Sequence, residues 1–151
     1  MIQKTIDNYL IIRTGWLFGG NTDSAKNFVI NRFVEAENSN GKIFSNLNQM
    51  GNPTYTNDLV RTIYALINRN ISGLFNCVNK GNASRFEYVA EIINLFGLSV
   101  KVKGVKKSDF NRKADVSDNE MAINTRLSEI SLDQMPDWKL SLKEYIRSIK
   151  L

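Results

Sequence analysis

The chain has 151 residues, of which 42% are hydrophobic and 23% charged, and its net charge is +5. This balance is typical of one globular domain that buries a substantial core. With no histidine and a single cysteine, Cys77, the chain cannot form an internal disulfide, a histidine-based catalytic triad or a zinc site of histidine and cysteine ligands.

The sequence carries no membrane signal. No run reaches the roughly 18 apolar residues that a membrane span needs. The first residues, MIQKTIDNY, lack the apolar segment of a signal peptide. We therefore expect a cytoplasmic protein without a membrane partner, and a single cysteine is compatible with a reducing compartment.

The net positive charge is concentrated in one segment. Residues 101–113, KVKGVKKSDFNRK, hold six basic residues and one acid, and the rest of the chain is neutral. Three interpretations are open: a solvated strand and loop, a site that attracts a diphosphate, and a nucleic-acid surface. Nucleic-acid binding would require stacking aromatic residues among the basic ones, and only Phe110 is present. We expect no nucleic-acid partner.

The first half of the chain predicts alternating strands and helices. A continuous apolar run predicts a short buried strand over residues 9–14. A helix is expected over 24–37, followed by a weak strand over 42–45. Thr56 is then expected to cap a helix that runs to Asn68. The apolar residues expected to face inward on the two helices are Phe28, Val29, Phe33, Val34, Leu59, Ile63, Leu66 and Ile67.

A second buried strand is expected over residues 74–78. After it, Ser84 and Glu87 have the spacing of a capping box, in which the serine and the glutamate satisfy each other's backbone N–H groups at a helix start. Gly97 supplies the left-handed residue that ends this helix.

The C-terminal third predicts one more strand over residues 100–105, broken at Gly104, and a final amphipathic helix from Asp137. Residues 111–119 are polar and irregular. Strands that alternate with helices of this length indicate an α/β layer structure with some parallel pairing. Because the strands are few and the chain starts almost directly on one, we expect the second half of a larger fold.

Six segments of the chain have the form of family motifs. In chain order they are RTGWLFG at 13–19, KNFV at 26–29, NQMGNPTYTNDLV at 48–60, SGLFN at 72–76, SRFEYVAEI at 84–92 and DW at 137–138. In the same order they resemble motifs of the dTDP-4-dehydrorhamnose reductases, extended members of the short-chain dehydrogenase/reductase superfamily. RTGWLFG resembles R-T-S-W-L/V-Y/F-G, and GNPTYT resembles the more specific G-x-P-T-Y-T.

The resemblance implies the C-terminal, substrate-binding part of a Rossmann-like fold, with residues 1–151 as one domain of few strands with flanking helices. It implies that the loop after the first strand lies beside a nicotinamide and a nucleotide-linked sugar. The implied substrate-binding residues are Trp16, Phe18, Asn27, Gln49, Pro53, Thr54 and Tyr55. The implied residues near the cofactor are Thr14, Gly15 and Leu17.

The residues themselves leave other interpretations open. Trp16 is also compatible with an aromatic plug in the core, and Asn27 with an ordinary residue of a first helical turn. Residues 53–56 equally describe a proline turn followed by a threonine cap. Asp58 is expected to be structural, as an acid in the first turn of a helix.

The sequence departs from the family pattern at three positions and lacks two motifs. Gly15 replaces a serine or threonine, Asn48 replaces an acid, and Met121 replaces the serine of an R-P-x-x-S-x-L-D segment. There is no glycine-rich G-x-x-G-x-x-G turn for a cofactor pyrophosphate and no Tyr-x-x-x-Lys pair for proton transfer. We therefore assign no catalytic residue and expect the N-terminal dinucleotide-binding domain to be absent.

These features favour the sugar-nucleotide-binding part of an NADPH-dependent reductase of a dTDP-4-keto-6-deoxy sugar, inactive as this chain alone. The resemblance places this reaction in dTDP-rhamnose and surface polysaccharide synthesis. NADP(H) would belong to the complete enzyme, with no cofactor expected for the isolated chain. The alternatives are part of another nucleotide-sugar epimerase or dehydratase, and a non-catalytic interaction module. Each predicts a homo-oligomer, or association through the face left by the missing domain.

Overall fold

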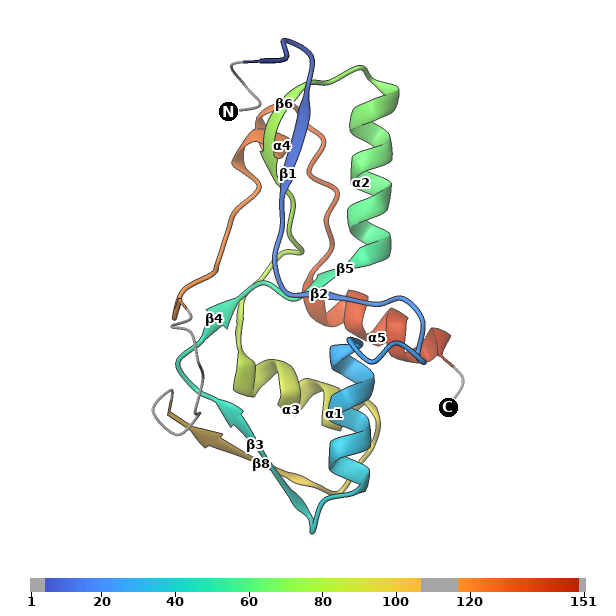
Figure 1. Ribbon diagram of the computed structural model, residues 1–151, viewed down its shortest axis with the longest axis vertical. Helices are drawn as coiled ribbons and strands as arrows, with labels where there is room; N and C mark the ends of the chain where they lie inside the picture. The colour runs from blue at the N-terminus through green and yellow to red at the C-terminus, as the bar shows by residue number, and fades with distance from the viewer. Residues whose placement is uncertain (1–4, 107–116, 150–151) are drawn as a thin grey trace.

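The computed structural model describes residues 5–106 and 117–149. The molecule is elongated in Figure 1. Strands β1 (Leu10–Arg13) and β6 (Gly73–Asn76) lie near one end beside helix α2 (Thr56–Asn68). Helices α1 (Phe28–Glu37) and α3 (Arg85–Leu95) lie near the other end.

The strands form four pairs. Strand β1 runs parallel to β6, with Ile12 opposite Phe75, and β3 (Lys42–Asn46) runs parallel to β8 (Lys101–Val105). These four strands confirm the predicted ones. Strand β8 continues through Gly104, which pairs with Ser45, so the predicted break there is wrong. A Cβ at Gly104 would meet the Leu47 side chain, so glycine at this position allows a close approach within an unbroken strand.

Four two-residue strands escaped the sequence pattern, because two residues are too few to show a period. Strand β2 (Leu17–Phe18) runs parallel to β5 (Thr54–Tyr55), and β4 (Met50–Gly51) runs antiparallel to β7 (Ala83–Ser84). Strands β2 and β5 lie in the middle of the molecule near helix α5 (Trp138–Ser148), and β4 lies on the other side of the molecule at a similar height (Figure 1). The short helix α4 (Thr125–Glu129) also was not predicted.

The helix ends partly correct the sequence prediction. Helix α1 begins at Phe28 rather than at 24, because the Asn27 side chain caps it. Helix α2 spans the predicted residues, but its N-cap is Tyr55, without a side-chain cap bond, so the predicted Thr56 cap is wrong. The capping box of Ser84 and Glu87 is confirmed.

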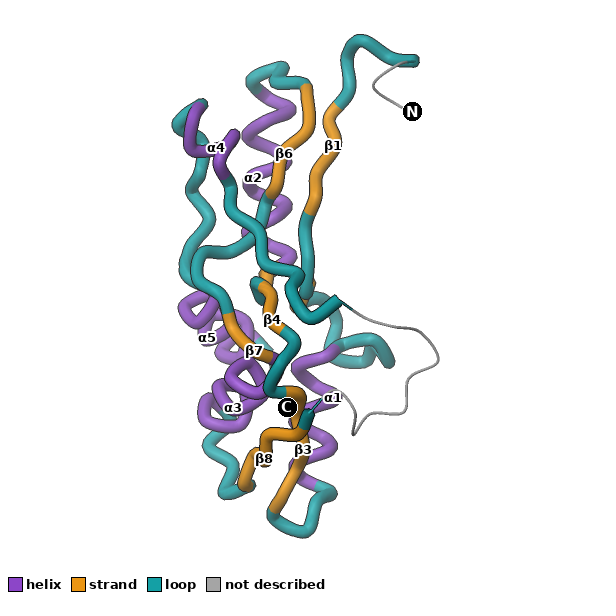
Figure 2. Tube along the Cα trace, turned by 90° about the vertical axis from the view of Figure 1, so that its left-hand side faces the viewer, coloured by secondary structure: helices purple, strands orange, loops and turns teal. Residues whose placement is uncertain are grey.

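Among the described residues, three clusters of buried residues form the core, and Figure 2 shows α3 beside α5 and α2 beside β6, two pairs of elements that contribute to them. The central cluster is aromatic and includes Phe18, Tyr55, Tyr88, Trp138 and Tyr145. The Phe18 and Tyr55 rings stack with centroids 5.4 Å apart. A second cluster lies under α2 and β6, and a third joins α1, α3 and β3.

Two of the apolar residues expected to face inward do not. Val34 is 48% exposed and Ile67 is 56% exposed, because each lies at the margin of its helix's apolar stripe. Leu59, Leu66 and Val29 are buried as expected. Within residues 5–106 and 117–149, the helices are too short or too polar to span a membrane.

Candidate functional site

Trp16 lies just beyond the carboxyl end of β1 and has an uncommon backbone. Its φ is +45°, in the left-handed region that residues other than glycine rarely occupy. The Thr54 N–H donates to its carbonyl oxygen at 3.1 Å, which fixes this turn against β5. The indole packs so closely on Gly51 that a Cβ there would overlap the ring. Glycine in β4 therefore makes the surface on which Trp16 lies.

Polar groups surround the Trp16 ring. Its Nε1–H donates to Glu120 Oε2 at 2.5 Å, and Gln49 Nε2 donates to the same oxygen at 3.4 Å. The Arg85 guanidinium carbon lies 3.5 Å from the centroid of the indole, the geometry of a cation–π contact. Trp16 is half-buried and borders the aromatic cluster without being enclosed by it. We call Trp16, Gln49, Gly51, Arg85 and Glu120 the Trp16 cluster.

Gln49 carries a buried acceptor without a hydrogen-bond partner. The residue is 4% exposed, and its Oε1 has no partner among the described residues. Exchanging the amide nitrogen and oxygen would aim Oε1 at the Glu120 carboxylate, which is unfavourable, so the hydrogen-bond pattern supports the orientation described. A buried acceptor of this kind is costly unless a donor reaches it.

Pro53, Thr54 and Tyr55, which were predicted to bind the substrate, have buried side chains. The Thr54 hydroxyl donates to Asn52 O at 3.0 Å, and the Tyr55 N–H donates to Asn79 Oδ1 at 2.8 Å. Burial raises the pKa of the Tyr55 phenol, and the nearby Glu144 carboxylate adds to the increase. Their contact with a nucleotide stays a prediction.

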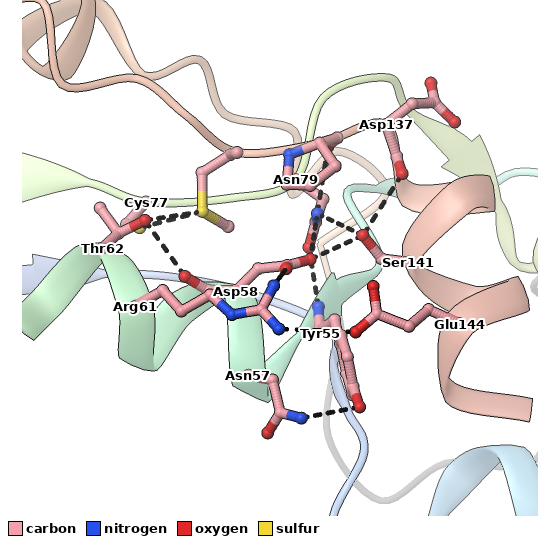
Figure 3. Close-up of polar contacts among 12 residues, drawn as sticks. Tyr55, Asn57, Asp58, Arg61, Thr62, Cys77, Asn79, Asp137, Ser141 and Glu144 are labelled. Atoms are coloured by element: carbon pink, nitrogen blue, oxygen red, sulfur yellow. Dashed lines mark hydrogen bonds and ion pairs between the residues drawn. The ribbon is translucent and has the colours of Figure 1, made fainter. Parts of the chain in front are cut away.

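Asp58 is buried and has polar partners from three segments (Figure 3). Its Oδ2 accepts from Asn79 Nδ2 at 2.9 Å and from the Ser141 hydroxyl at 2.6 Å. Its Oδ1 accepts from Arg61 Nη1 at 3.4 Å. These contacts agree with the structural role predicted for Asp58, although the sequence did not indicate Asn79 or Ser141 as its partners.

Asn27 is 5% exposed, and its amide is engaged within the protein. Oδ1 accepts from the Ile30 N–H at 3.2 Å, as the cap of α1. Nδ2 donates to the Tyr145 hydroxyl at 2.6 Å and to Asn21 O at 3.1 Å. Substrate binding by Asn27 stays a prediction.

The remaining predicted site residues surround the Trp16 turn. Phe18 is buried in the aromatic cluster, whereas Thr14 and Leu17 are exposed. No atom lies within 4 Å of the position that a Cβ would take at Gly15. The turn thus presents an open surface at the carboxyl end of β1.

A pocket of about 830 Å³ lies at the end of β4, where Asn52 lines it. None of the predicted site residues lines this pocket. Asn52, Asn76 and Asn124 are among its lining residues, with Lys80 and Asp133. The Asn52 Oδ1 accepts from the Ala122 N–H at 2.8 Å, and Asn52 directly follows Gly51 of the Trp16 cluster along the chain. The sequence did not predict this pocket, although Asn52 and Asn76 lie in segments that resemble family motifs, because its lining residues come from segments far apart along the chain.

Neither a nucleophile nor a metal site is evident in the described part of the chain. Cys77 is buried, and burial raises the pKa of its thiol to about 11, so its reactive thiolate is scarce at neutral pH. Among residues 5–106 and 117–149, no three acidic or cysteine side chains are grouped to hold a metal ion.

Short parallel strands, flanking helices and an aromatic turn at a strand's carboxyl end define the substrate-binding part of an extended short-chain dehydrogenase/reductase. The structure is similar to a dTDP-4-dehydrorhamnose reductase from Clostridium acetobutylicum, with a TM-score of 0.90 and 33% identity over 97% of this chain and 50% of that one. It is also similar to a dTDP-4-dehydrorhamnose reductase from Bacillus anthracis in complex with NADP. The TM-score is 0.89, with 27% sequence identity over 99% of this chain and 51% of that one.

The sequence is also 26% identical to the spore coat polysaccharide biosynthesis protein SpsK of Bacillus subtilis, over 97% of this chain and 50% of that protein. Residues 1–151 match the RmlD substrate binding domain, and the chain belongs to this family. It spans about half the length of the curated relatives it matches.

The residues of this chain do not fit a complete dinucleotide site. The pyrophosphate of such a cofactor requires a glycine-rich turn at a helix N-terminus, and the sequence has no such turn. Contact of Thr14, Gly15 and Leu17 with a cofactor stays a prediction, and we assign no step through NADP(H) to this chain.

Proposed function

We propose that this chain is the sugar-nucleotide-binding portion of a dTDP-4-dehydrorhamnose reductase-like enzyme. Together with a dinucleotide-binding portion, it would reduce a dTDP-4-keto-6-deoxy sugar with NADPH, in dTDP-rhamnose synthesis in the cytoplasm. Alone, it would bind the sugar nucleotide weakly and reduce nothing, because the catalytic tyrosine and the cofactor turn are absent from its sequence. We expect no nucleic-acid or membrane partner.

The position of Trp16 is the observation that carries this proposal. In open α/β folds, ligands bind beyond the carboxyl ends of the parallel strands, and Trp16 lies there at the end of β1. A half-buried indole offers a flat apolar face to the C–H groups of a sugar ring. It is held on Gly51, within a motif that resembles a specific family segment.

Gln49 supports a nucleotide end for the same site. No donor of the described residues reaches its buried Oε1, and the N–H of a pyrimidine base is a donor that would satisfy it. Pro53, Thr54 and Tyr55 would then act by holding this loop, because their own side chains face the interior.

A tryptophan-fluorescence titration with dTDP-rhamnose tests the proposal, with NADPH and a single-stranded oligonucleotide as comparison ligands. Saturable quenching by the sugar nucleotide is expected, lost in Trp16→Phe and retained in Trp138→Phe, which replaces the other, buried tryptophan. If the chain alone does not respond, the titration is repeated with a dinucleotide-binding portion from a relative added. Absence of binding in that complex would contradict the proposed function.

A further inference from the structure

Glu120 directly precedes Met121, at a position that the R-P-x-x-S-x-L-D pattern leaves unspecified, and its carboxylate accepts a hydrogen bond from the Trp16 ring. The indole N–H donates to its carboxylate at 2.5 Å, and the Gln49 amide donates to the same oxygen at 3.4 Å. One carboxylate oxygen therefore joins two of the predicted substrate-binding residues. A hydrogen bond to a charged acceptor is stronger than one between neutral groups.

The backbone fixes where Glu120 lies. Its N–H donates to Met50 O at 2.9 Å, and the Met50 N–H donates to Asp118 O at 2.8 Å. Residues 118–120 thus pair with β4, and the next residue of β4, Gly51, is the one on which the indole packs. The carboxylate and the glycine surface are consequently held by one strand and contact the same ring.

Trp16 needs such support because its conformation is not favoured locally. A left-handed φ costs free energy for any residue with a side chain and persists only where surrounding contacts impose it. Gly51 restrains the ring by shape alone, which still permits sliding and rotation. A hydrogen bond to Nε1 also fixes the rotation of the ring within its plane, since the indole has a single N–H.

We propose that Glu120 is a positioning residue, which holds the Trp16 indole in the orientation that receives the sugar. The expected effect of Glu120 on sugar-nucleotide binding rests on the proposed function. The hydrogen bond from the indole to Glu120 is a property of the chain without ligand. Glu120 acts through Trp16 and Gln49 and takes no part in a chemical step.

The first test uses the ligand-free 151-residue chain and NMR of its two indole N–H groups, assigned with Trp16→Phe. In Glu120→Ala, we expect the Trp16 N–H resonance to move upfield and its hydrogen exchange to become roughly ten-fold faster, as for the loss of a charged hydrogen bond. Glu120→Gln, which keeps an acceptor, should restore much of the protection. The matched control is Glu129→Ala, which removes an exposed carboxylate on α4 and should leave both resonances unchanged.

The second test measures dTDP-rhamnose affinity, with the dinucleotide-binding portion added if the chain alone binds too weakly. Glu120→Ala should weaken binding roughly ten-fold. In the Trp16→Phe background, the same substitution should have little further effect if Glu120 acts through the indole.

An unchanged Trp16 resonance in Glu120→Ala would overturn the proposal, as would unchanged affinity while the unmodified protein binds. A resonance that responds to Glu120→Ala in a protein that binds no sugar nucleotide would refute the proposed function and still support the hold on Trp16.

Discussion

The side-chain amide of Asn79 donates a hydrogen bond of 2.9 Å to the buried carboxylate of Asp58, and this contact joins the loop after β6 to the first turn of α2. Asn79 is itself completely buried. Its Oδ1 accepts from the Tyr55 N–H, and its Nδ2 also contacts Pro136 O and the Ser141 hydroxyl. One asparagine thus links the motif around Tyr55 to the start of α5 (Figure 3).

Replacing Asn79 should therefore destabilise the whole domain. Asn79→Ala removes several buried hydrogen bonds and leaves the Tyr55 N–H and Asp58 with fewer partners. We expect the free energy of unfolding to fall by about 3 kcal/mol, measured by urea denaturation. Asn82→Ala, at an exposed asparagine nearby, is the control and should change it by about 0.5 kcal/mol or less. Equal effects of the two substitutions would contradict this interpretation.

Gly51→Ala should disturb Trp16, because the added methyl group would overlap the indole ring. We expect a loss of about 1–3 kcal/mol in stability from overpacking, together with a shift in the Trp16 fluorescence maximum. Gly15→Ala is the matched control, since nothing lies within 4 Å of a Cβ there and its backbone is not left-handed. Wild-type emission and stability in Gly51→Ala would show that the ring does not lie on β4.

The capping box of α3 predicts a dependence of stability on pH. Glu87 accepts from the Ser84 N–H at 2.6 Å and from the Ser84 hydroxyl at 2.9 Å, and the backbone hydrogen bond is the main reason that its pKa lies below the ordinary 4.5. A carboxyl with a lowered folded-state pKa stabilises the fold above its unfolded-state pKa. This contribution is lost as the pH falls through the folded-state value.

We therefore expect Glu87→Gln to be less stable than the unmodified chain above pH 4.5, with the difference shrinking as the pH is lowered further. Thermal unfolding across this range measures it. Ser84→Ala removes the hydroxyl that accepts from the Glu87 N–H. It should lower the free energy of unfolding by about 1 kcal/mol near neutral pH. If the difference in stability between Glu87→Gln and the unmodified chain grew as the pH fell, the predicted direction of the pH dependence would be wrong.

The exposed edge of β1 predicts self-association of the isolated chain. Among the described residues, β1 pairs with β6 alone, and Ile11 is half-buried without belonging to a core cluster. An unpaired apolar strand edge promotes pairing with another chain. We expect light scattering to show a dimer or larger species, and Ile11→Lys to shift it toward monomer. A monodisperse monomer of the unmodified chain would refute this prediction.

Features determined by neighbouring residues were predictable from the sequence. The capping box of Ser84 and Glu87 is a contact across three positions, and the apolar run of β1 needs no distant partner to be recognised. The margins of the apolar stripes were less predictable. Val34 and Ile67 have the right spacing to be buried, but whether a neighbouring element covers the edge of a helix depends on the packing of the whole domain.

The sequence by itself determined the α/β alternation and the family resemblance, and it predicted a ligand site at the turn of Trp16. The tertiary structure alone decided what holds that turn. Glu120 lies 104 positions along the chain from Trp16, and Asn79 lies 21 positions from Asp58, so no local pattern links either pair. Contacts at such separations arise only when folding brings the segments together, because burial and hydrogen bonding depend on neighbours in space rather than in sequence.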